Sequence, residues 1–385
     1  MDDRIGRGRG PEQASRGLSR RDFARMAALL SAGATLPFYN EAALAQDLRT
    51  ITNVRPDAVK LNANENPMGP CPSAIEAMRA IIPEGGRYLF PLSFTFADTL
   101  ADLEGVPASY VLPFAGSSDP LHRSVLAFTS PKRPLVTADP GYEAPERAAR
   151  FMGAKVIQVP LRKDYSHDTP AMAKVDPDAG VIYVCNPNNP TGTVTSKADI
   201  DALVANKPKG CVVVIDEAYI HFTTATSPAT DLVAAGKDVI VLRTFSKLYG
   251  MAGLRAGAAI ARPDLLEKLK SQGGLGMMPA TGMIGATASL KEKGLVAERR
   301  GTVASIREDL CSWMDRKGYT YIPSEANMVL VRGKGPGRDT VQAMLQHKVA
   351  IGRSWPSLPN HVRVTIGTRD EMAKFKSAFE RVMDA

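Results

Sequence analysis

Apolar runs of strand length recur along the chain and alternate with segments of helical pattern. The runs are nearly continuous and rich in β-branched residues, which is typical of strands buried on both faces of a mostly parallel sheet covered by helices. Helical segments are clear at 93–106 and 118–129. The pattern therefore predicts an α/β fold. The predicted strands are Tyr110–Phe114, Arg133–Ala138, Lys155–Pro160, Val181–Cys185, Cys211–Ile215, Val239–Leu242 and Ala256–Ala261.

The C-terminal part of the chain has a different pattern. Residues from about 283 to 317 are helical in pattern, and Gly318 ends this segment. Strands and helices then alternate over shorter lengths, which predicts a smaller α+β domain. The candidates are strands at Met328–Arg332 and Val362–Ile366 and helices at 337–347 and 370–384.

Length and composition refine this organisation. A chain of 385 residues exceeds what one hydrophobic core usually supports, so we expect two subdomains. We place an N-terminal arm at 46–75, a large domain at 76–284 and a small domain at 285–385. The net charge of +8 is spread along the chain without a dense basic patch, so we expect no nucleic-acid partner.

Residues 1–45 differ from the rest. They hold seven arginines and no lysine, with Arg20-Arg21 ahead of an apolar stretch from Met26 to Phe38. Ala43-Leu44-Ala45 then forms a small-x-small processing site, so this order predicts a twin-arginine export signal and a periplasmic protein. The apolar stretch is short for a bilayer span, so we expect no stable membrane anchor. The alternative is an amphipathic helix at the start of a cytoplasmic protein.

The cysteines and histidines suggest neither a disulfide framework nor a metal site. The four cysteines have no paired spacing, and two of them, Cys185 and Cys211, fall in predicted core strands. The five histidines are scattered, with none paired at i, i+4. We therefore expect no metal.

Lys247 is the first candidate for chemistry. It follows the apolar run Val239–Leu242, with Ser246 before it and Arg255 eight residues on. A desolvated lysine can lose its proton near neutral pH and form a Schiff base with an aldehyde. The arginine and the hydroxyl suit a phosphate on the same molecule. The pattern indicates an aldehyde cofactor that carries a phosphate.

Other segments supply complementary groups. Gly116-Ser117-Ser118 opens a predicted helix, where backbone amides can bind a phosphate. The turn Asn186–Gly192, rich in asparagine and proline, places Asn189 where its amide can donate to a phenolate oxygen, which Tyr219 could share. Asp216 ends a buried run, and a buried carboxylate needs a cation such as a protonated pyridine nitrogen.

Together these motifs resemble the fold type I pyridoxal-phosphate aminotransferases, and most of all the histidinol-phosphate aminotransferase family. The segment Leu61–Pro70 is similar to that family's N-terminal motif, and the resemblance extends from about residue 55 to the C-terminus. It implies a mostly parallel seven-stranded sheet in a large domain, a smaller α+β domain and pyridoxal 5'-phosphate as cofactor.

The resemblance also assigns roles to matched positions. Lys247 would hold the cofactor and shuttle a proton, while Asp216 would pair with the pyridine nitrogen. The remaining cofactor-binding residues would be Ser117, Ser118, Tyr142, Asn189, Tyr219, Ser246, Arg255 and, from a neighbouring subunit, Tyr88. The substrate-binding residues would be Arg363 for the α-carboxylate, Asn327 and Ala63 near it, and Arg353 for the far end of the substrate.

The implied activity is transfer of an amino group between an L-amino acid, or an amine like histidinol phosphate, and a 2-oxo acid by a ping-pong mechanism. Tyr88 implies a homodimer with composite sites. Pro120 replaces the family's acidic residue in the phosphate loop, and Trp355-Pro356 stands in a short stretch between the two arginines, so we expect a remodelled distal pocket. A decarboxylase or an oxidative deaminase on the same fold is the alternative.

Overall fold

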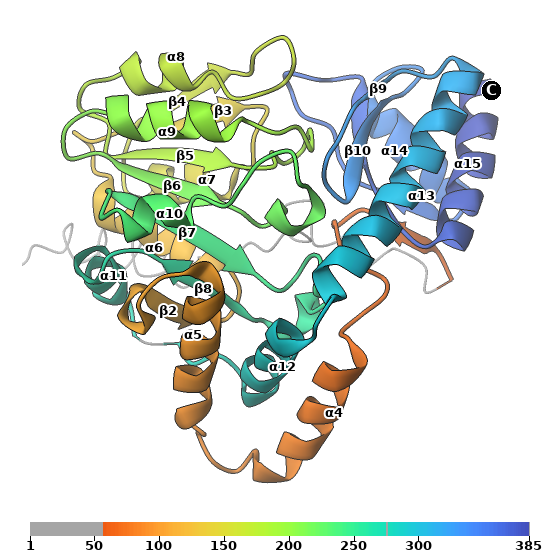
Figure 1. Ribbon diagram of the computed structural model, residues 1–385. Helices are drawn as coiled ribbons and strands as arrows, with labels where there is room; N and C mark the ends of the chain where they lie inside the picture. Colours follow the sequence, from red (N-terminus) through yellow and green to blue (C-terminus); the bar gives the residue numbers. More distant parts are fainter. Residues whose placement is uncertain (1–56, 275, 385) are drawn as a thin grey trace, which may run out of the picture. The chain divides into compact units, whose positions relative to one another are not determined.

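A seven-stranded sheet organises the part of the chain that the structure describes (Figure 1). This computed structural model describes residues 57–274 and 276–384, all within one compact unit, Tyr39–Ala385. The strand order is β2-β8-β7-β6-β5-β3-β4, and every strand is parallel to the others except β8. The strands are β2 Val111–Phe114, β3 Leu135–Asp139, β4 Val156–Pro160, β5 Val181–Cys185, β6 Val212–Asp216, β7 Val239–Thr244 and β8 Gly257–Ile260.

The predicted α/β class and mostly parallel sheet are confirmed, and each predicted strand overlaps an observed one. β5 and β6 are buried at every position because each lies between two strands and under helices on both faces. The two edge strands are less buried: β4 has only β3 as a neighbour and exposes Gln158, and β2 has only β8 as a neighbour and is half-buried at Leu112 and Pro113. The near-continuous apolar runs therefore predicted the strands correctly, but they predicted more burial at the sheet edges than the structure shows.

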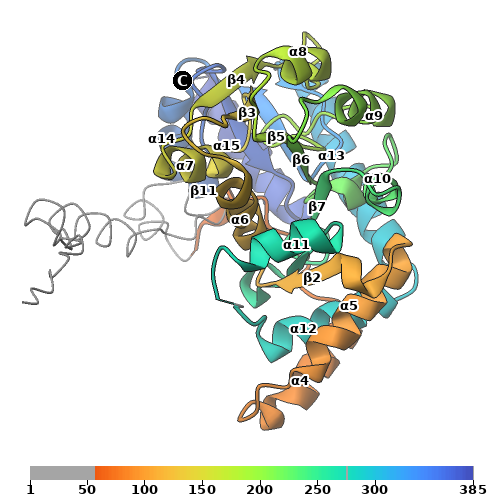
Figure 2. The ribbon, with the colours of Figure 1, turned by 90° about the vertical axis from the view of Figure 1, so that its left-hand side faces the viewer.

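Helices cover both faces of this sheet. α6 and α7 lie on one face, and α8, α9 and α10 lie on the other (Figures 1 and 2). Side-chain caps begin α8 and α9, where Asp168 accepts from the amide of Ala171 and Ser196 from that of Asp199. The helices are α6 Ser118–Phe128, α7 Ala144–Phe151, α8 Thr169–Lys174, α9 Lys197–Asn206, α10 Thr230–Ala234 and α11 Pro263–Lys270.

Three helices pack together below the sheet in Figure 1. They are α4 Pro72–Ile81, α5 Pro91–Glu104 and α12 Ala280–Lys291. α12 is separated from α13, Leu295–Lys317, at Gly294, where φ is +81°. The segment predicted as helical from about 283 to 317 is therefore two helices, because a left-handed residue cannot continue a right-handed helix. Four short 3-10 helices are η1 Ile82–Glu84, η2 Ala108–Tyr110, η3 Ile220–Phe222 and η4 Ala252–Leu254.

Two smaller sheets are built mainly from the C-terminal part, with β1 from near the start of the described residues. One is antiparallel in the order β12-β10-β9, and the other pairs β1 with β11 in parallel. β1 brings residues near 60 beside residues near 350, a pairing that the sequence pattern did not predict. The elements are β1 Val59–Leu61, β9 Tyr321–Ile322, β10 Met328–Arg332, β11 Val349–Ile351, β12 His361–Thr365, α14 Gly337–Gln346 and α15 Arg369–Asp384.

Two predictions on the chain's organisation remain predictions. The export signal at 1–45 lies outside the described residues, and the boundary between large and small domains is not tested by these sheets. Among the residues described, no helix has both the length and the apolar character that crossing a membrane would need.

Candidate functional site

A cavity of about 230 Å³ lies at the carboxyl ends of β5, β6 and β7. In α/β sheets ligands bind at this edge. The last residues of the three strands, Cys185, Asp216 and Thr244, line the cavity. Most of the predicted site residues line it too: Ala63, Ser117, Ser118, Tyr142, Asn189, Asp216, Tyr219, Ser246, Lys247 and Arg255.

Lys247 lies in the wall of this cavity, in the loop that follows β7. Its side chain is only 7% exposed, and Nζ donates to the carbonyl oxygen of Ala63 at 3.2 Å. Nζ also lies 5.7 Å from the ring centroid of Tyr219. The tertiary structure thus holds a desolvated primary amine at one place in the cavity, which is the condition under which a lysine acts as a nucleophile or base.

Asp216 also lines the cavity and is buried at the end of β6. Burial raises the pKa of this carboxyl and outweighs two hydrogen bonds and the charge of Lys247, which lower it, so that the pKa is about 6. The bonds come from the Tyr183 hydroxyl to Oδ2 at 3.0 Å and from the Ala218 amide to Oδ1 at 3.2 Å. The carboxylate is therefore oriented by neutral donors, and a cationic ligand would relieve its desolvation.

Tyr183 is a site residue that the sequence analysis missed. It is buried inside β5, where burial raises the pKa of its hydroxyl well above 10, so the hydroxyl remains a donor. In the sheet register Tyr183 pairs with Val214 and Cys185 pairs with Asp216, so the Tyr183–Asp216 bond runs diagonally across the two strands. The sequence did contain a signal for this residue. Side chains alternate between the two faces of a strand, so Tyr183 lies on the same face as Cys185.

Arg255 also lines the cavity. Its guanidinium donates to the carbonyl oxygens of Ala115 and Ala252, each at 3.0 Å, and to the hydroxyl of Ser246 at 3.3 Å. All three acceptors are neutral, and burial lowers the pKa of Arg255. A partly buried cation held by neutral oxygens favours an anionic ligand, as the sequence pattern predicted.

Gly116 explains how the guanidinium fits. Its φ is +93°, and a Cβ at this position would collide with Nη2 of Arg255. Glycine therefore permits both the left-handed backbone and the close approach. Ser117 and Ser118 follow at the start of α6, so the amides of this helix and Arg255 face the same cavity.

The Asn186–Gly192 turn brings Asn189 to the cavity and connects it to the C-terminal sheet. Oδ1 of Asn189 accepts a 2.8 Å hydrogen bond from Nη1 of Arg363 in β12. The bond orients the amide of Asn189 by fixing its acceptor side. Arg363 is fully buried and also donates to the carbonyl oxygen of Asn62 at 2.9 Å. Arg363 does not line the cavity itself but lies directly behind Asn189.

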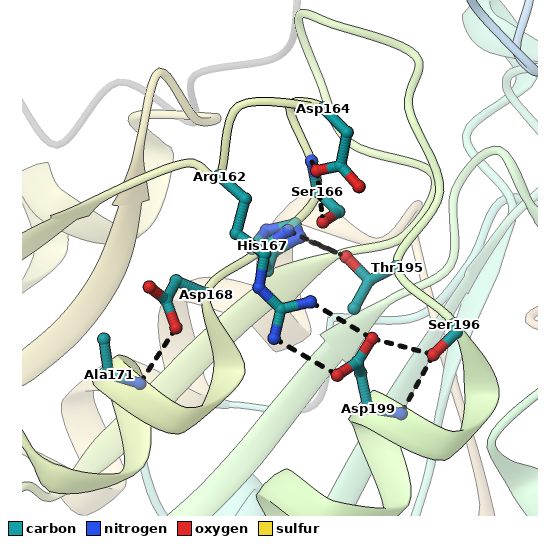
Figure 3. Close-up of polar contacts among 9 residues, drawn as sticks. All are labelled: Arg162, Asp164, Ser166, His167, Asp168, Ala171, Thr195, Ser196 and Asp199. Atoms are coloured by element: carbon teal, nitrogen blue, oxygen red, sulfur yellow. Dashed lines mark hydrogen bonds and ion pairs between the residues drawn. The ribbon is translucent and has the colours of Figure 1, made fainter.

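A network of polar side chains supports this turn from outside the cavity. The side chain of Asn186 and the backbone of Thr195 exchange two hydrogen bonds of 2.9 Å. Thr195 Oγ1 in turn contacts Nδ1 of His167 at 2.8 Å and accepts from its amide at 3.1 Å (Figure 3). Burial lowers the pKa of His167 to about 4, so the imidazole is neutral at physiological pH. Its role is structural support.

The segment that carries Ala63 is tied to the cavity by Asn64 and Asn327. Asn64 has φ of +52° and donates from Nδ2 to the hydroxyl of Tyr219 at 3.0 Å. Asn327 donates to the carbonyl oxygens of Asn64 and Glu65 at 3.2 and 3.3 Å. Asn64 was not predicted as a site residue, and Asn327 supports the segment from behind instead of lining the cavity.

Two other predicted residues lie away from the cavity wall. Tyr88 is 76% exposed and stacks on Phe90, with 5.6 Å between the ring centroids. Its predicted role concerns a neighbouring subunit and stays a prediction. Arg353 forms a two-point ion pair with Glu143, the residue that follows Tyr142. The predicted contact of Arg353 with the substrate also stays a prediction.

The chain is similar in sequence to known aminotransferases. Residues 56–379 match the model of the family described as aminotransferase class I and II. The chain is 33% identical over 329 residues to histidinol-phosphate aminotransferase of Symbiobacterium thermophilum, covering 85% of this chain and 91% of that protein. It is also 33% identical over 314 residues to aromatic amino acid aminotransferase of Cutibacterium acnes, covering 81% and 88%.

Solved structures agree with the sequence matches. The crystal structure of histidinol-phosphate aminotransferase from Sinorhizobium meliloti in complex with pyridoxal-5'-phosphate superimposes with a TM-score of 0.82 at 25% identity. The match covers 95% of this chain and 99% of that one. The similarity therefore spans both the cavity and the C-terminal sheets.

Proposed function

Because the chain belongs to the class I and class II aminotransferases, we propose that it moves an amino group between an L-amino acid, or an amine like histidinol phosphate, and a 2-oxo acid. It is a pyridoxal-phosphate-dependent aminotransferase. The observation that carries the substrate proposal is the position of Arg363, which bonds to the cavity-lining Asn189. A guanidinium thus stands directly behind the part of the cavity wall that Asn189 forms.

The donor set of the cavity fits pyridoxal phosphate. The buried carboxylate of Asp216 suits the protonated ring nitrogen, and Arg255 with Ser246 and the start of α6 suits the phosphate. Gly116 keeps the space that the Arg255 guanidinium needs. Tyr142 and Ala218 also line the cavity, so they would enclose the ring.

Pyridoxal phosphate supplies an aldehyde that condenses with amines and a ring that takes up the electron pair of a breaking bond. Lys247 would hold the cofactor through Nζ, and the same atom would take up the α-proton of the donor. Asp216 would keep a proton on the ring nitrogen, because its buried negative charge favours a neighbouring cation.

Arg363 would orient the donor. A guanidinium binds a carboxylate through two parallel hydrogen bonds, which fixes the direction of the α-carbon as well as its distance. Complete burial of Arg363, and its bonds to Asn189 and Asn62, hold the guanidinium still before the substrate arrives. Such preorganisation lowers the entropic cost of placing the α-proton at Lys247.

The test is a screen of amino donors with the purified protein. A productive donor converts the visible absorbance of the lysine-bound cofactor to that of the aminated cofactor and releases its 2-oxo acid. Addition of a 2-oxo acid should reverse the change. Release of carbon dioxide or hydrogen peroxide in place of this exchange would refute the proposal.

We also propose a homodimer with composite sites. Tyr88, Phe90, Phe94 and Ile82 are exposed large apolar side chains on α5 and the segment before it, with exposed fractions of 55–76%. Such a cluster on a soluble protein marks an interaction surface. Sedimentation equilibrium tests the dimer, and a substitution of Tyr88 by Phe tests the shared site. A monomer with normal cofactor affinity would contradict this proposal.

For localisation we propose export to the periplasm by the twin-arginine route. Arg20-Arg21, the apolar stretch after them and Ala43-Leu44-Ala45 support it. That route carries folded proteins, which suits an enzyme that acquires its cofactor before export. Fractionation of cells that express the native chain and an Arg20→Lys, Arg21→Lys variant tests it. Equal cytoplasmic retention of both would refute it.

A further inference from the structure

Arg243 is a buried cation outside the lining of the cofactor cavity. It lies in β7, one residue before the cavity-lining Thr244, and its side chain is 2% exposed. Its guanidinium donates to both carboxylate oxygens of Glu104, from Nε at 2.6 Å and from Nη2 at 2.8 Å, and Nη1 contacts Oε2 of Glu217. Burial lowers the pKa of Arg243, but the two carboxylates raise it by more, so the guanidinium stays charged. One cation therefore holds two carboxylates from distant parts of the chain.

The two carboxylates have all their oxygens bonded. Oε1 of Glu217 accepts from the amide of Ala229 at 2.8 Å, and Oε2 of Glu104 also accepts from the hydroxyl of Thr230 at 3.2 Å. The side chains of Glu217 and Glu104 are 2% and 11% exposed. A buried ionic group with every polar atom bonded is held in one geometry, because a shift would leave a donor or an acceptor without its partner. The cluster thus joins the ends of α5 and β6 to β7 and to the start of α10.

Glu217 connects this cluster to the cavity. It directly follows Asp216, the last residue of β6, and its amide donates to the carbonyl oxygen of Leu242 at 3.2 Å. Leu242 precedes Arg243, so both the backbone and the side chain of Glu217 are bonded to β7. Burial raises the pKa of Asp216, and the charge of Glu217 raises it further. A second negative charge beside Asp216 also favours a cation at that carboxylate.

We propose that Glu217 and Arg243 are positioning residues for the cofactor, which hold the carboxylate of Asp216 where it meets the ring nitrogen. Neither residue lines the cavity, so both act through Asp216. Tyr183 bonds to the same carboxylate from β5, so Asp216 is held from both neighbouring strands. This inference rests on the contact between Asp216 and the ring nitrogen that the proposed function includes.

Binding of two ligands to the apoprotein tests this directly. One is pyridoxal phosphate, and the other is 1-deazapyridoxal phosphate, in which carbon replaces the ring nitrogen. The wild-type protein should bind pyridoxal phosphate more tightly, because only this ligand offers Asp216 a cation. Glu217→Gln removes a charge and leaves one oxygen for two donors, so the Kd of pyridoxal phosphate should rise about tenfold. The Kd of the analogue should stay within about twofold, whereas a general loosening of the fold would weaken both ligands alike.

A double-mutant cycle shows whether the effect passes through Asp216. In the Asp216→Asn background, Glu217→Gln should change the Kd of pyridoxal phosphate by less than about twofold, because the contact that it supports is already lost. Glu146→Gln is the matched control. Glu146 is also a buried glutamate that accepts from an arginine, Arg150, and from a second donor, Gln158, each at 2.8 Å, but it does not line the cavity. Its Kd values for both ligands should equal those of the wild type.

Two results would overturn the inference. One is an unchanged preference for pyridoxal phosphate over the analogue in Glu217→Gln, and the other is an equal effect of this substitution with and without Asp216. If Glu217→Gln does not fold, Glu104→Gln decides. It removes one of the two parallel bonds that orient Arg243, so it should raise the Kd of pyridoxal phosphate about threefold and spare the analogue. Wild-type affinity for pyridoxal phosphate in this variant would contradict the proposal.

The wild-type measurement separates this inference from the proposed function. Equal affinity of the wild type for the two ligands would remove Asp216 from the ring nitrogen, and the proposed function would lose its contact along with this inference. A wild-type preference for pyridoxal phosphate that survives in Glu217→Gln sinks this inference alone.

Discussion

The hydroxyl of Tyr183 donates a 3.0 Å hydrogen bond to Oδ2 of Asp216, diagonally from β5 to β6. Both residues are buried, so solvent does not compete for this bond. It partly offsets the effect of burial, which raises the pKa of this carboxyl group, and the resulting pKa is about 6. Tyr183 would therefore act on the cofactor through Asp216, as a positioning residue.

Tyr183→Phe should weaken cofactor binding while preserving the fold. The substitution removes one oxygen from a buried side chain, raises the pKa of Asp216 further and leaves its carboxylate less firmly oriented. A hydrogen bond to a charged group contributes about 1.5–3 kcal/mol, so the Kd of pyridoxal phosphate should rise about tenfold or more. Titration of the apoprotein with the cofactor measures this.

The matched control is Tyr321→Phe. Tyr321 also donates to an aspartate, Asp315, at 3.3 Å, but on an exposed surface away from the cavity. Cofactor affinity should be unaffected there. Equal Kd values for Tyr183→Phe and the wild type would remove Tyr183 from the site.

Asp216→Asn should stabilise the apoprotein in a pH-dependent way. The pKa of Asp216 is about 6 in the folded protein and 3.8 in its reference state, so the folded state binds the proton more tightly. Stability from this group is therefore lost as pH rises through 4 to 6, and the full penalty, about 3 kcal/mol, applies above pH 6. The asparagine variant has no carboxylate at this position and therefore lacks this penalty.

Urea unfolding of both apoproteins at pH 4.5 and pH 7.5 checks this sign. The variant should gain stability over the wild type at pH 7.5 and approach it at pH 4.5. The same variant should bind pyridoxal phosphate poorly, because its ring nitrogen loses a negative partner. A constant stability difference between the two pH values would contradict the assignment.

Gly116→Ala should impair recognition of the phosphate. The added Cβ would collide with the Arg255 guanidinium, and φ of +93° would strain the backbone. Affinity for pyridoxal phosphate should fall by about tenfold or more, whereas affinity for pyridoxal, which lacks the phosphate, should change little. Parallel titrations with the two molecules measure the difference.

Gly105→Ala separates collision from strain. Gly105 has φ of +67° but no atom within 4 Å of an added Cβ, so this variant carries the backbone strain alone. It should lose stability and retain phosphate recognition. If both variants lost the preference for pyridoxal phosphate equally, the contact between Gly116 and Arg255 would not be the reason.

Thr195→Val should destabilise the turn that holds Asn189. The hydroxyl of Thr195 is buried and bonds to the amide and to Nδ1 of His167, and valine would leave both without this partner. Each such loss costs about 1–3 kcal/mol. Thr302→Val is the control, since its hydroxyl bonds to Glu298 on an exposed helix face. Thermal unfolding should give a clearly lower melting temperature for Thr195→Val than for Thr302→Val. Equal melting temperatures would show that the hydroxyl of Thr195 does not support the turn.

Local patterns determined the strands and the residues that end them. Asp216 and Lys247 could be assigned to one edge of a parallel sheet because each follows an apolar run, and parallel strands end at the same edge. Glycine and serine after β2 identified the start of α6 in the same way. Hydrophobic periodicity is a property of neighbouring residues, so a sequence can reveal it without knowledge of the fold.

Contacts between distant segments depended on tertiary structure alone. Arg363 reaches Asn189, and Asn64 reaches Tyr219, across 174 and 155 residues of chain. Arg353, whose predicted contact with the substrate stays a prediction, is paired by the fold with Glu143, 210 residues earlier in the chain. No local pattern encodes such partners, because they result from the packing of all the elements between them. The sequence by itself indicated the chemistry of the cavity, whereas the tertiary structure decided which distant side chains meet around it and orient its groups.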